Sequence, residues 1–140
     1  MQRISVFIAA LIGLSSVALG AYFQHASVLN SDAKIAIHTA LRYLQMYSLL
    51  LLVLGFLSQQ YSRLLWAYAV FLVGVSLFSG SILLIHSFGM SSLVLVTPLG
   101  GVIVMLGWVV LMSLAIVGFG DQIQSPRPSI TTQEKSAIER

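Results

Sequence analysis

Four long apolar runs, separated by short polar segments, set the pattern of this sequence. The runs cover about residues 4–23, 41–57, 64–86 and 97–119, and most charged residues lie between or beyond them. A helix needs about 20 mainly apolar residues to cross a bilayer. Irregular backbone cannot face lipid, because its N–H and C=O groups would find no hydrogen-bond partner there, and runs of this length suit helices. We therefore predict an all-α integral membrane protein, a four-helix transmembrane bundle.

Two of the apolar runs can be interpreted in more than one way. The second run is short, and residues 32–42 can lengthen it as a helix that reaches into the interface. The first run could be a secretory signal peptide cleaved after Gly20, but it is longer than the ~7–15 apolar residues of such a peptide, which favours a span. Residues 121–140 carry two prolines and mixed charge and bury little apolar surface, so we expect a flexible tail.

Composition narrows the class of protein further. Charged residues make up 8% of the chain, whereas a soluble domain has about 25%. The chain has no cysteine, which excludes disulfides, thiol catalysis and cysteine metal sites. Its formal net charge of +3 includes no block of like charges of the kind that binds nucleic acid. We expect the lipid bilayer as its surroundings, with other membrane subunits or a second copy as possible partners.

The distribution of Lys and Arg predicts the orientation. Four spans place the N-terminus, the second loop and the tail on one side of the membrane, and basic residues near span ends favour the cytoplasm. We therefore expect cytoplasmic N- and C-termini in the inner (plasma) membrane. The side that holds both termini has four basic residues near span ends, Arg3, Arg63, Arg127 and Lys135. The opposite side has two, Lys34 and Arg42.

Small residues predict where the helices touch. Lipid is as apolar as leucine, so helices associate in membranes where small side chains let their backbones approach. Pairs of small residues four positions apart recur in the first, third and fourth runs. We expect helix contacts at Gly13, Gly20, Ser76, Gly80, Gly101 and Gly107.

Thr97 and Pro98 mark the start of the fourth helix. Threonine is a good N-cap, and proline fits the first helical position, where its missing N–H costs nothing. We favour a helix capped by Thr97. The alternative is a helix that starts at Ser92 and is kinked at Pro98.

Polar residues gather at the ends of the spans that the predicted orientation places outside the cytoplasm. Lys34, His38, Arg42, Gln45 and Ser48 fall on one side of a helix. Ionisable residues at such depth are costly, so they face the bundle or extend their charged ends to water. We expect His25, Arg42 and Gln45 to converge, with Tyr43 beside them.

Three interpretations of this polar end stay open. In the first, Arg42 and Lys34 reach lipid headgroups and the histidines sit in wet interface. In the second, His25, Arg42 and Gln45 hold a small molecule, a quinone or a lipid headgroup. The third is a metal site, which imidazole suits, made by the three histidines His25, His38 and His86. We predict neither metal nor cofactor, since the three histidines share only their side of the membrane.

The sequence shows no catalytic constellation. Ser79, Gly80 and Ser81 lack the strand and turn of a hydrolase nucleophile, and we interpret them as a helix contact whose hydroxyls bond to the preceding turn. No acid lies within any span, which argues against a carboxylate proton relay. We therefore predict that the protein is not an enzyme.

Several short motifs follow one another along the chain: residues 17–21 (VALGA), His25, Tyr43, residues 77–81 (LFSGS), residues 97–101 (TPLGG) and the pair Gly107-Trp108. In this order they resemble a known family, called domain of unknown function 423, whose eukaryotic relatives are called transmembrane protein 256. The resemblance spans about residues 4–119 and implies a four-helix membrane protein, in bacteria in the inner membrane, with no established activity.

The chain departs from that family at two places. Phe23 and Gln24 stand where the family pattern has small residues before the histidine. A family motif Tyr-Gln-x-x-His in the second helix has Leu44 at the glutamine position and Tyr47 at the histidine position. Any chemistry that relatives perform with that second histidine is therefore lost or altered here.

Three classes of function follow. We favour a non-enzymatic accessory or structural subunit of a membrane complex. The alternative is a small transporter or a protein that binds a lipid- or quinone-type ligand at its extracytoplasmic end, and an enzyme or redox carrier is third. A polar cavity that continues past Gln45 would support transport, whereas a dry core would support a subunit.

Overall fold

The protein is a bundle of four long helices in the computed structural model, which describes residues 2–25 and 31–118. All four are long and apolar enough to cross a membrane, and no strand occurs in the described part of the chain. The predicted all-α, four-helix fold is confirmed, whereas the predicted tail 121–140 lies outside the described residues. The elements are α1 (Gln2–His25), α2 (Ser31–Leu57), α3 (Leu64–Phe88), the 3-10 helix η1 (Ser91–Leu95) and α4 (Val96–Val117).

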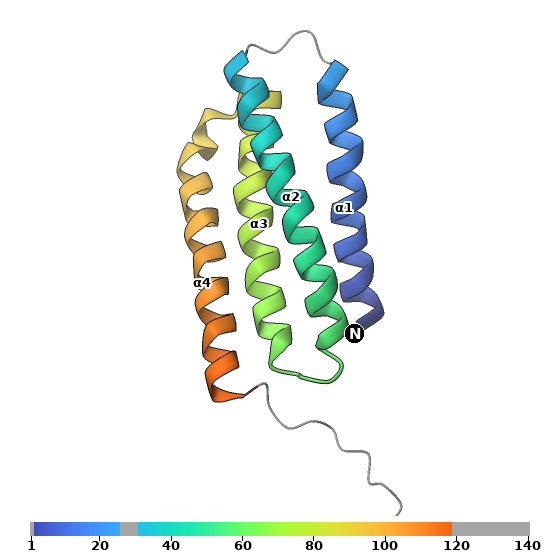
Figure 1. Ribbon diagram of the computed structural model, residues 1–140. Coiled ribbons are helices and arrows are strands. Elements are labelled where there is room, and N and C mark those ends of the chain that lie inside the picture. The colour runs from blue at the N-terminus through green and yellow to red at the C-terminus, as the bar shows by residue number, and fades with distance from the viewer. Residues whose placement is uncertain (1, 26–30, 119–140) are drawn as a thin grey trace, which may run out of the picture.

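The helices pack side by side in the order of the chain (Figure 1). α2 contacts α1 on one side and α3 on the other, and α4 contacts α3. Within the described ranges, α1 and α4 do not pack against each other. The first residues of α1 and the last of α4 lie at the same end of the bundle (Figure 1). We call this the terminal end, and the opposite end the α1–α2 end.

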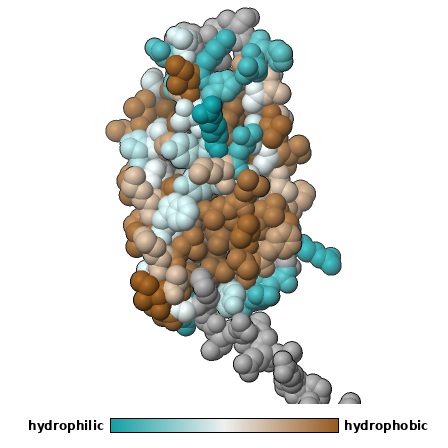
Figure 2. Space-filling view, viewed as in Figure 1, coloured by the Kyte–Doolittle hydropathy of each residue, from teal (hydrophilic) through white to brown (hydrophobic). Residues whose placement is uncertain are grey.

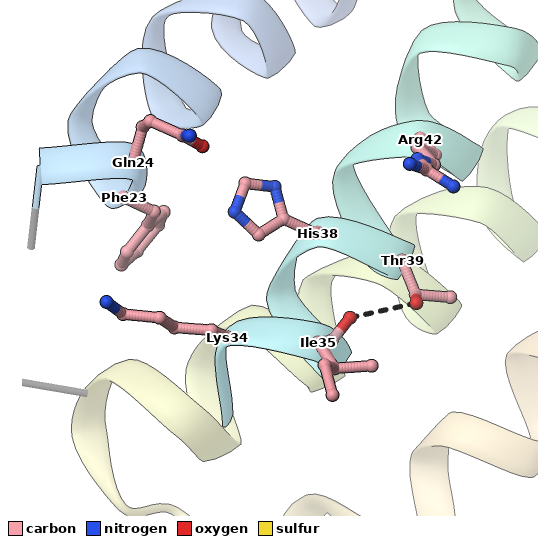
Figure 3. A pocket seen from close by; sticks show the side chains of 7 residues that line it. All are labelled: Phe23, Gln24, Lys34, Ile35, His38, Thr39 and Arg42. Carbon is pink, nitrogen blue, oxygen red and sulfur yellow. Dashed lines mark hydrogen bonds between the residues drawn. The ribbon is translucent and has the colours of Figure 1, made fainter. Parts of the chain in front are cut away.

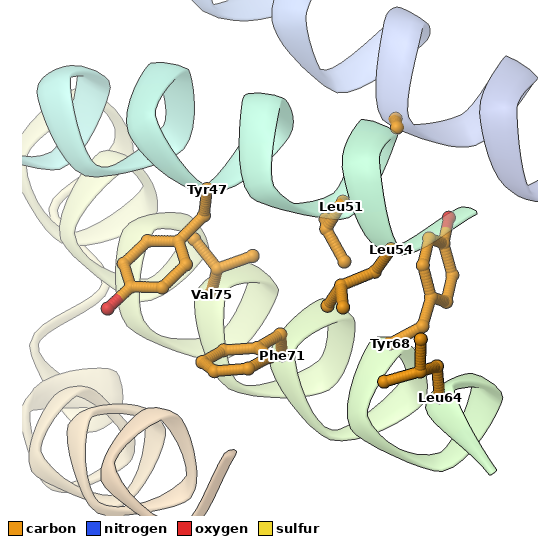
Figure 4. Packing of buried hydrophobic residues seen from close by; sticks show 8 residues of the cluster. Tyr47, Leu51, Leu54, Leu64, Tyr68, Phe71 and Val75 are labelled. Atoms are coloured by element: carbon orange, nitrogen blue, oxygen red, sulfur yellow. The ribbon is translucent and has the colours of Figure 1, made fainter. Parts of the chain in front are cut away.

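The main core lies between α2 and α3 (Figure 4). Leu51 of α2 and Phe71 of α3 are completely buried, and Val75 lies beside them. Toward the terminal end, the Tyr68 hydroxyl donates a 2.8 Å hydrogen bond to the carbonyl oxygen of Ser5, which links α3 to α1. Apolar side chains thus fill the interior from its centre to its terminal end.

The closest helix approach is between α3 and α4, and three glycines permit it. A Cβ at Gly100 would collide with the backbone nitrogen of Phe78. A Cβ at Gly74 would lie 2.9 Å from the backbone nitrogen of Val104. At Gly107 it would lie 2.8 Å from the ring of Phe71. Only glycine allows the two backbones to pack this closely.

The structure corrects part of the predicted packing surface. Gly80 is not a contact within the bundle, because no atom lies within 4 Å of the position of its missing Cβ, and Ser76 is exposed. Both point away from α2 and α4 because they lie on the opposite side of α3 from Gly74. The other predicted glycines lie nearer to neighbours: a Cβ would be 3.2 Å from Ser48 at Gly13, 4.0 Å from Leu41 at Gly20 and 3.8 Å from Phe78 at Gly101.

The two serines beside Gly80 join α3 to both of its neighbours. The Ser79 hydroxyl donates to the carbonyl oxygen of Ala40 in α2 at 3.1 Å, and not to its own preceding turn as expected. The Ser81 hydroxyl donates to the carbonyl of Phe78 at 3.0 Å and lies 2.7 Å from the Thr97 hydroxyl of α4. Because Ser81 has a single hydroxyl proton, Thr97 is the donor in the second bond.

The start of α4 differs from both predicted alternatives. Thr97 is not an N-cap: Leu95 holds that position, with no side-chain cap, and α4 begins at Val96. Pro98 falls within the first turn, where no helical hydrogen bond needs its N–H. The 3-10 turn η1 leads directly into the helix, which explains why a threonine cap is not needed. Thr97 is thereby free to bond Ser81.

Candidate functional site

In the described part of the chain, a polar groove and an aromatic pocket lie at the surface of α2. The polar groove is between α1 and α2 at the α1–α2 end and has a volume of about 530 Å³. Figure 2 shows hydrophilic side chains gathered over this end of the molecule, with a hydrophobic surface below. The groove is lined by Phe23, Gln24, Lys34, Ile35, His38, Thr39 and Arg42.

The periodicity of α2 brings its basic residues together on the side that lines the groove. Lys34, His38 and Arg42 are four residues apart, so successive turns of α2 present them on one side. Lys34 and His38 extend toward Phe23 and Gln24 at the end of α1 (Figure 3). Beneath them, buried Phe23 packs with Ile37 and Leu41 and holds the two helices together.

The groove is electropositive. Lys34 and Arg42 contribute two fixed positive charges, and no Asp or Glu is among the lining residues. Asp32 is the single acid in the part of the chain that the structure describes, and it does not line the groove. The Thr39 hydroxyl donates to the carbonyl of Ile35 at 2.9 Å, so it is already engaged. Amide, imidazole, ammonium and guanidinium donors therefore face a space that can accept an anion.

The structure does not assemble the predicted cluster of four residues. Arg42 lines the polar groove, whereas His25, Gln45 and Tyr43 do not. His25 and Gln45 are exposed, and no hydrogen bond joins either of them to Arg42 among the described residues. Tyr43 follows Arg42 directly but leaves α2 in another direction and lines the aromatic pocket. The other polar residues that line the groove with Arg42 include Lys34, His38 and Gln24. Lys34 and His38 belong to the predicted polar side of α2.

The aromatic pocket is formed by α2, α3 and α4 and has a volume of about 290 Å³. The indole N–H of Trp108 donates to the Tyr47 hydroxyl at 3.3 Å, and the ring of Tyr47 stacks on that of Tyr43 with centroids 6.2 Å apart. Tyr43 also meets Phe78 edge-on. The lining residues are Tyr43, Tyr47, Val75, Phe78, Gly101, Val104, Met105 and Trp108.

Sequence reasoning missed this pocket, although one signal pointed to it. Tyr47 stands at the position of a family histidine, and its side chain is buried against α3 and bonded to α4. Trp108 belongs to one motif of the family resemblance, the pair Gly107-Trp108. What the sequence could not show is that the two lie opposite each other across α3.

The histidines do not form a metal site in the described ranges. No group of three or more His, Cys, Asp or Glu side chains is placed there to hold an ion. His86 is engaged locally, with its Nδ1 3.0 Å from the carbonyl oxygen of Ile82. His38 lies in the polar groove, which includes neither His25 nor His86.

Comparison with known proteins places the chain among membrane proteins. The family described as "Protein of unknown function (DUF423)" matches residues 17–101. A "UPF0382 membrane protein" of Haemophilus influenzae is 30% identical over an alignment of 114 residues, and the match covers 78% of this chain and 90% of that protein. No solved structure matches the chain.

Proposed function

The chain belongs to the DUF423 family of small membrane proteins, and we propose that it is a non-enzymatic accessory or structural subunit of a membrane complex. We further propose that it resides in the inner membrane with both termini in the cytoplasm, as its Lys and Arg distribution favours.

The interior gives no support to a transport role. The lining of the polar groove ends at Arg42 and does not reach Gln45. Next to Arg42 inside the bundle lies buried Leu41, and two to three turns further along, Leu51 is completely buried. A solute would have to displace this packed core, which is costly. A subunit needs no such passage.

The aromatic pocket carries the proposal. It opens on the outer surface of the bundle, where Trp108 is 47% exposed and Tyr43 is 41% exposed. Protein interfaces are enriched in aromatic residues and methionine, and Met105 lines the same pocket. Gly101, which has no side chain, forms part of the pocket lining. The backbone of a neighbouring helix can therefore come close to α4 at this point. These features fit the insertion of a bulky side chain from a partner helix.

Site-specific cross-linking tests this role. A photoreactive amino acid at position 105 of the tagged full chain, irradiated in intact membranes, should give one discrete adduct that co-purifies in mild detergent. Gly101→Leu should abolish that adduct by filling the pocket. A Cβ at this position would meet the Phe78 ring at 3.8 Å, an ordinary contact distance, and the circular dichroism spectrum of the variant checks that the helices remain folded. The matched control is the same probe at Tyr22, which is highly exposed on α1.

Two results would oppose the proposal. One is a set of diffuse adducts at position 105 no different from those at position 22. The other is an adduct that persists unchanged in Gly101→Leu.

A second candidate function, binding of a lipid-type ligand, is favoured by the electropositive polar groove.

A further inference from the structure

We propose that the polar groove binds the headgroup of an anionic phospholipid, whose acyl chains then run along the outer face of α2. This inference deepens the second candidate function and requires no partner subunit. The aromatic pocket and the polar groove lie on different sides of α2, so the two proposals can fail separately.

The first step is the charge of the groove. Lys34 and Arg42 are eight residues apart, which is about 12 Å along a helix, and His38 lies between them. A phosphodiester placed between them would receive charge-assisted hydrogen bonds from two directions. Because no carboxylate of the described residues lines the groove, a zwitterionic headgroup would find no partner there for its ammonium group. A headgroup with net negative charge is therefore preferred.

The second step is depth. α2 has 27 residues, about 40 Å at the rise of an α-helix, and exceeds the ~30 Å hydrocarbon layer. With the opposite boundary set at Leu57, the last residue of α2, His38 is about 28 Å away from that boundary and Lys34 about 34 Å. Arg42 lies about 7 Å inside the boundary by the same measure, from where its long side chain can reach the phosphate layer. The groove thus spans the depth at which lipid phosphates lie.

The third step is the surface that continues from the groove. Further along the same side of α2 come Met46, Leu49 and Val53, and all three are exposed apolar residues. Figure 2 shows the hydrophilic region giving way to a hydrophobic one in this direction. A soluble anion would use the cationic part alone. A phospholipid has a charged head joined to apolar chains and matches both parts of the surface.

Native mass spectrometry of the full chain in a nonionic detergent tests the proposal. Phosphatidylglycerol and phosphatidylcholine with identical acyl chains are titrated in parallel. We expect phosphatidylglycerol to bind about tenfold more tightly, because two basic side chains act on it. Arg42→Gln and Lys34→Gln should each remove most of that preference. Arg42 is exposed, so its replacement leaves the core intact, which the circular dichroism spectrum checks.

Arg63→Gln is the matched control, because it removes the same charge from an exposed residue that directly precedes α3. The connection between α2 and α3 lies at the terminal end (Figure 1). This variant should keep the full preference for phosphatidylglycerol. Equal affinity for the two lipids would overturn the proposal, as would an equal loss in Arg63→Gln and Arg42→Gln.

Two further additions separate a lipid from a soluble anion. Excess inorganic phosphate should not displace bound phosphatidylglycerol, and deacylated glycerophosphoglycerol should bind far more weakly than the intact lipid. Displacement by phosphate, or equal binding of the deacylated compound, would assign the groove to a soluble anion and overturn the lipid proposal.

Discussion

The indole N–H of Trp108 in α4 donates a hydrogen bond to the hydroxyl oxygen of Tyr47 in α2 over 3.3 Å. The two helices have no backbone contact within the described residues, so this bond crosses α3. Phe71 of α3 completes the link, with its ring stacked on Tyr47 at 5.7 Å and edge-on to Trp108 at 5.4 Å. Three aromatic side chains thereby couple three helices.

A double-mutant cycle measures this link. Tyr47→Phe and Trp108→Phe should each lower the free energy of unfolding in detergent, and their coupling energy should be about 0.6 kcal/mol, as for other hydrogen bonds between membrane helices. Tyr43→Phe is the control, because the Tyr43 hydroxyl has no hydrogen bond to the described residues, and it should change little. A coupling energy near zero would mean that the 3.3 Å contact adds nothing to stability.

The Gly100 contact predicts a large effect from a single methyl group. Gly100→Ala places a Cβ against the backbone of Phe78, and backbone cannot rotate away as a side chain can. We expect a loss of about 1–3 kcal/mol, as for other overpacked sites, together with a lower melting temperature in detergent. Gly80→Ala should cause no loss, since nothing lies within 4 Å of its Cβ position. Equal effects of the two substitutions would contradict the α3–α4 geometry.

The hydrogen bond from Tyr68 to the carbonyl of Ser5 predicts a role in holding the start of α1. Tyr68→Phe removes a buried donor and should cost about 1 kcal/mol. Backbone amides of the first turns of α1 should then exchange hydrogen faster. Tyr22→Phe, on the exposed side of the same helix, should leave exchange unchanged. Unaltered protection of α1 in Tyr68→Phe would show that its packing on α2 is sufficient.

The proposed orientation is checked by reporter fusions. Alkaline phosphatase fused after Arg140 should be inactive, because the positive-inside rule keeps that end in the cytoplasm. The same reporter fused after Gly89, in the connection between α3 and η1, should be active. The reverse pattern would place the polar groove on the cytoplasmic side.

The helices themselves could be predicted from the sequence, because the lipid environment leaves few options for an apolar run of twenty residues. The side of each helix that packs against its neighbours could not be predicted. Gly80 and Gly100 occur in equally apolar surroundings, yet one points outward and the other meets a backbone. Hydrophobic periodicity separates inside from outside in soluble proteins, but in lipid both sides of a helix are apolar, so the pattern carries little information about rotation.

The sequence indicated which basic residues of α2 contribute to the polar groove, but it did not indicate which side chains from other positions point into it. The spacing of Lys34, His38 and Arg42 correctly indicated a stripe on one side of a helix. Adding His25 and Tyr43 relied on shared depth alone, and residues at one depth can point in any direction around a helix. Arg42 and Tyr43 are neighbours in sequence and line different hollows for this reason.

The packing of each helix against its predecessor in the chain has a consequence for biogenesis. α1 packs on α2, α2 on α3, and α3 on α4, so among the described residues each helix makes its main contacts with the next helix along the chain. Such local contacts cost little loop-closure entropy and favour fast assembly. During synthesis each newly inserted helix finds its docking surface already present in the membrane, and the last helix need not search for the first.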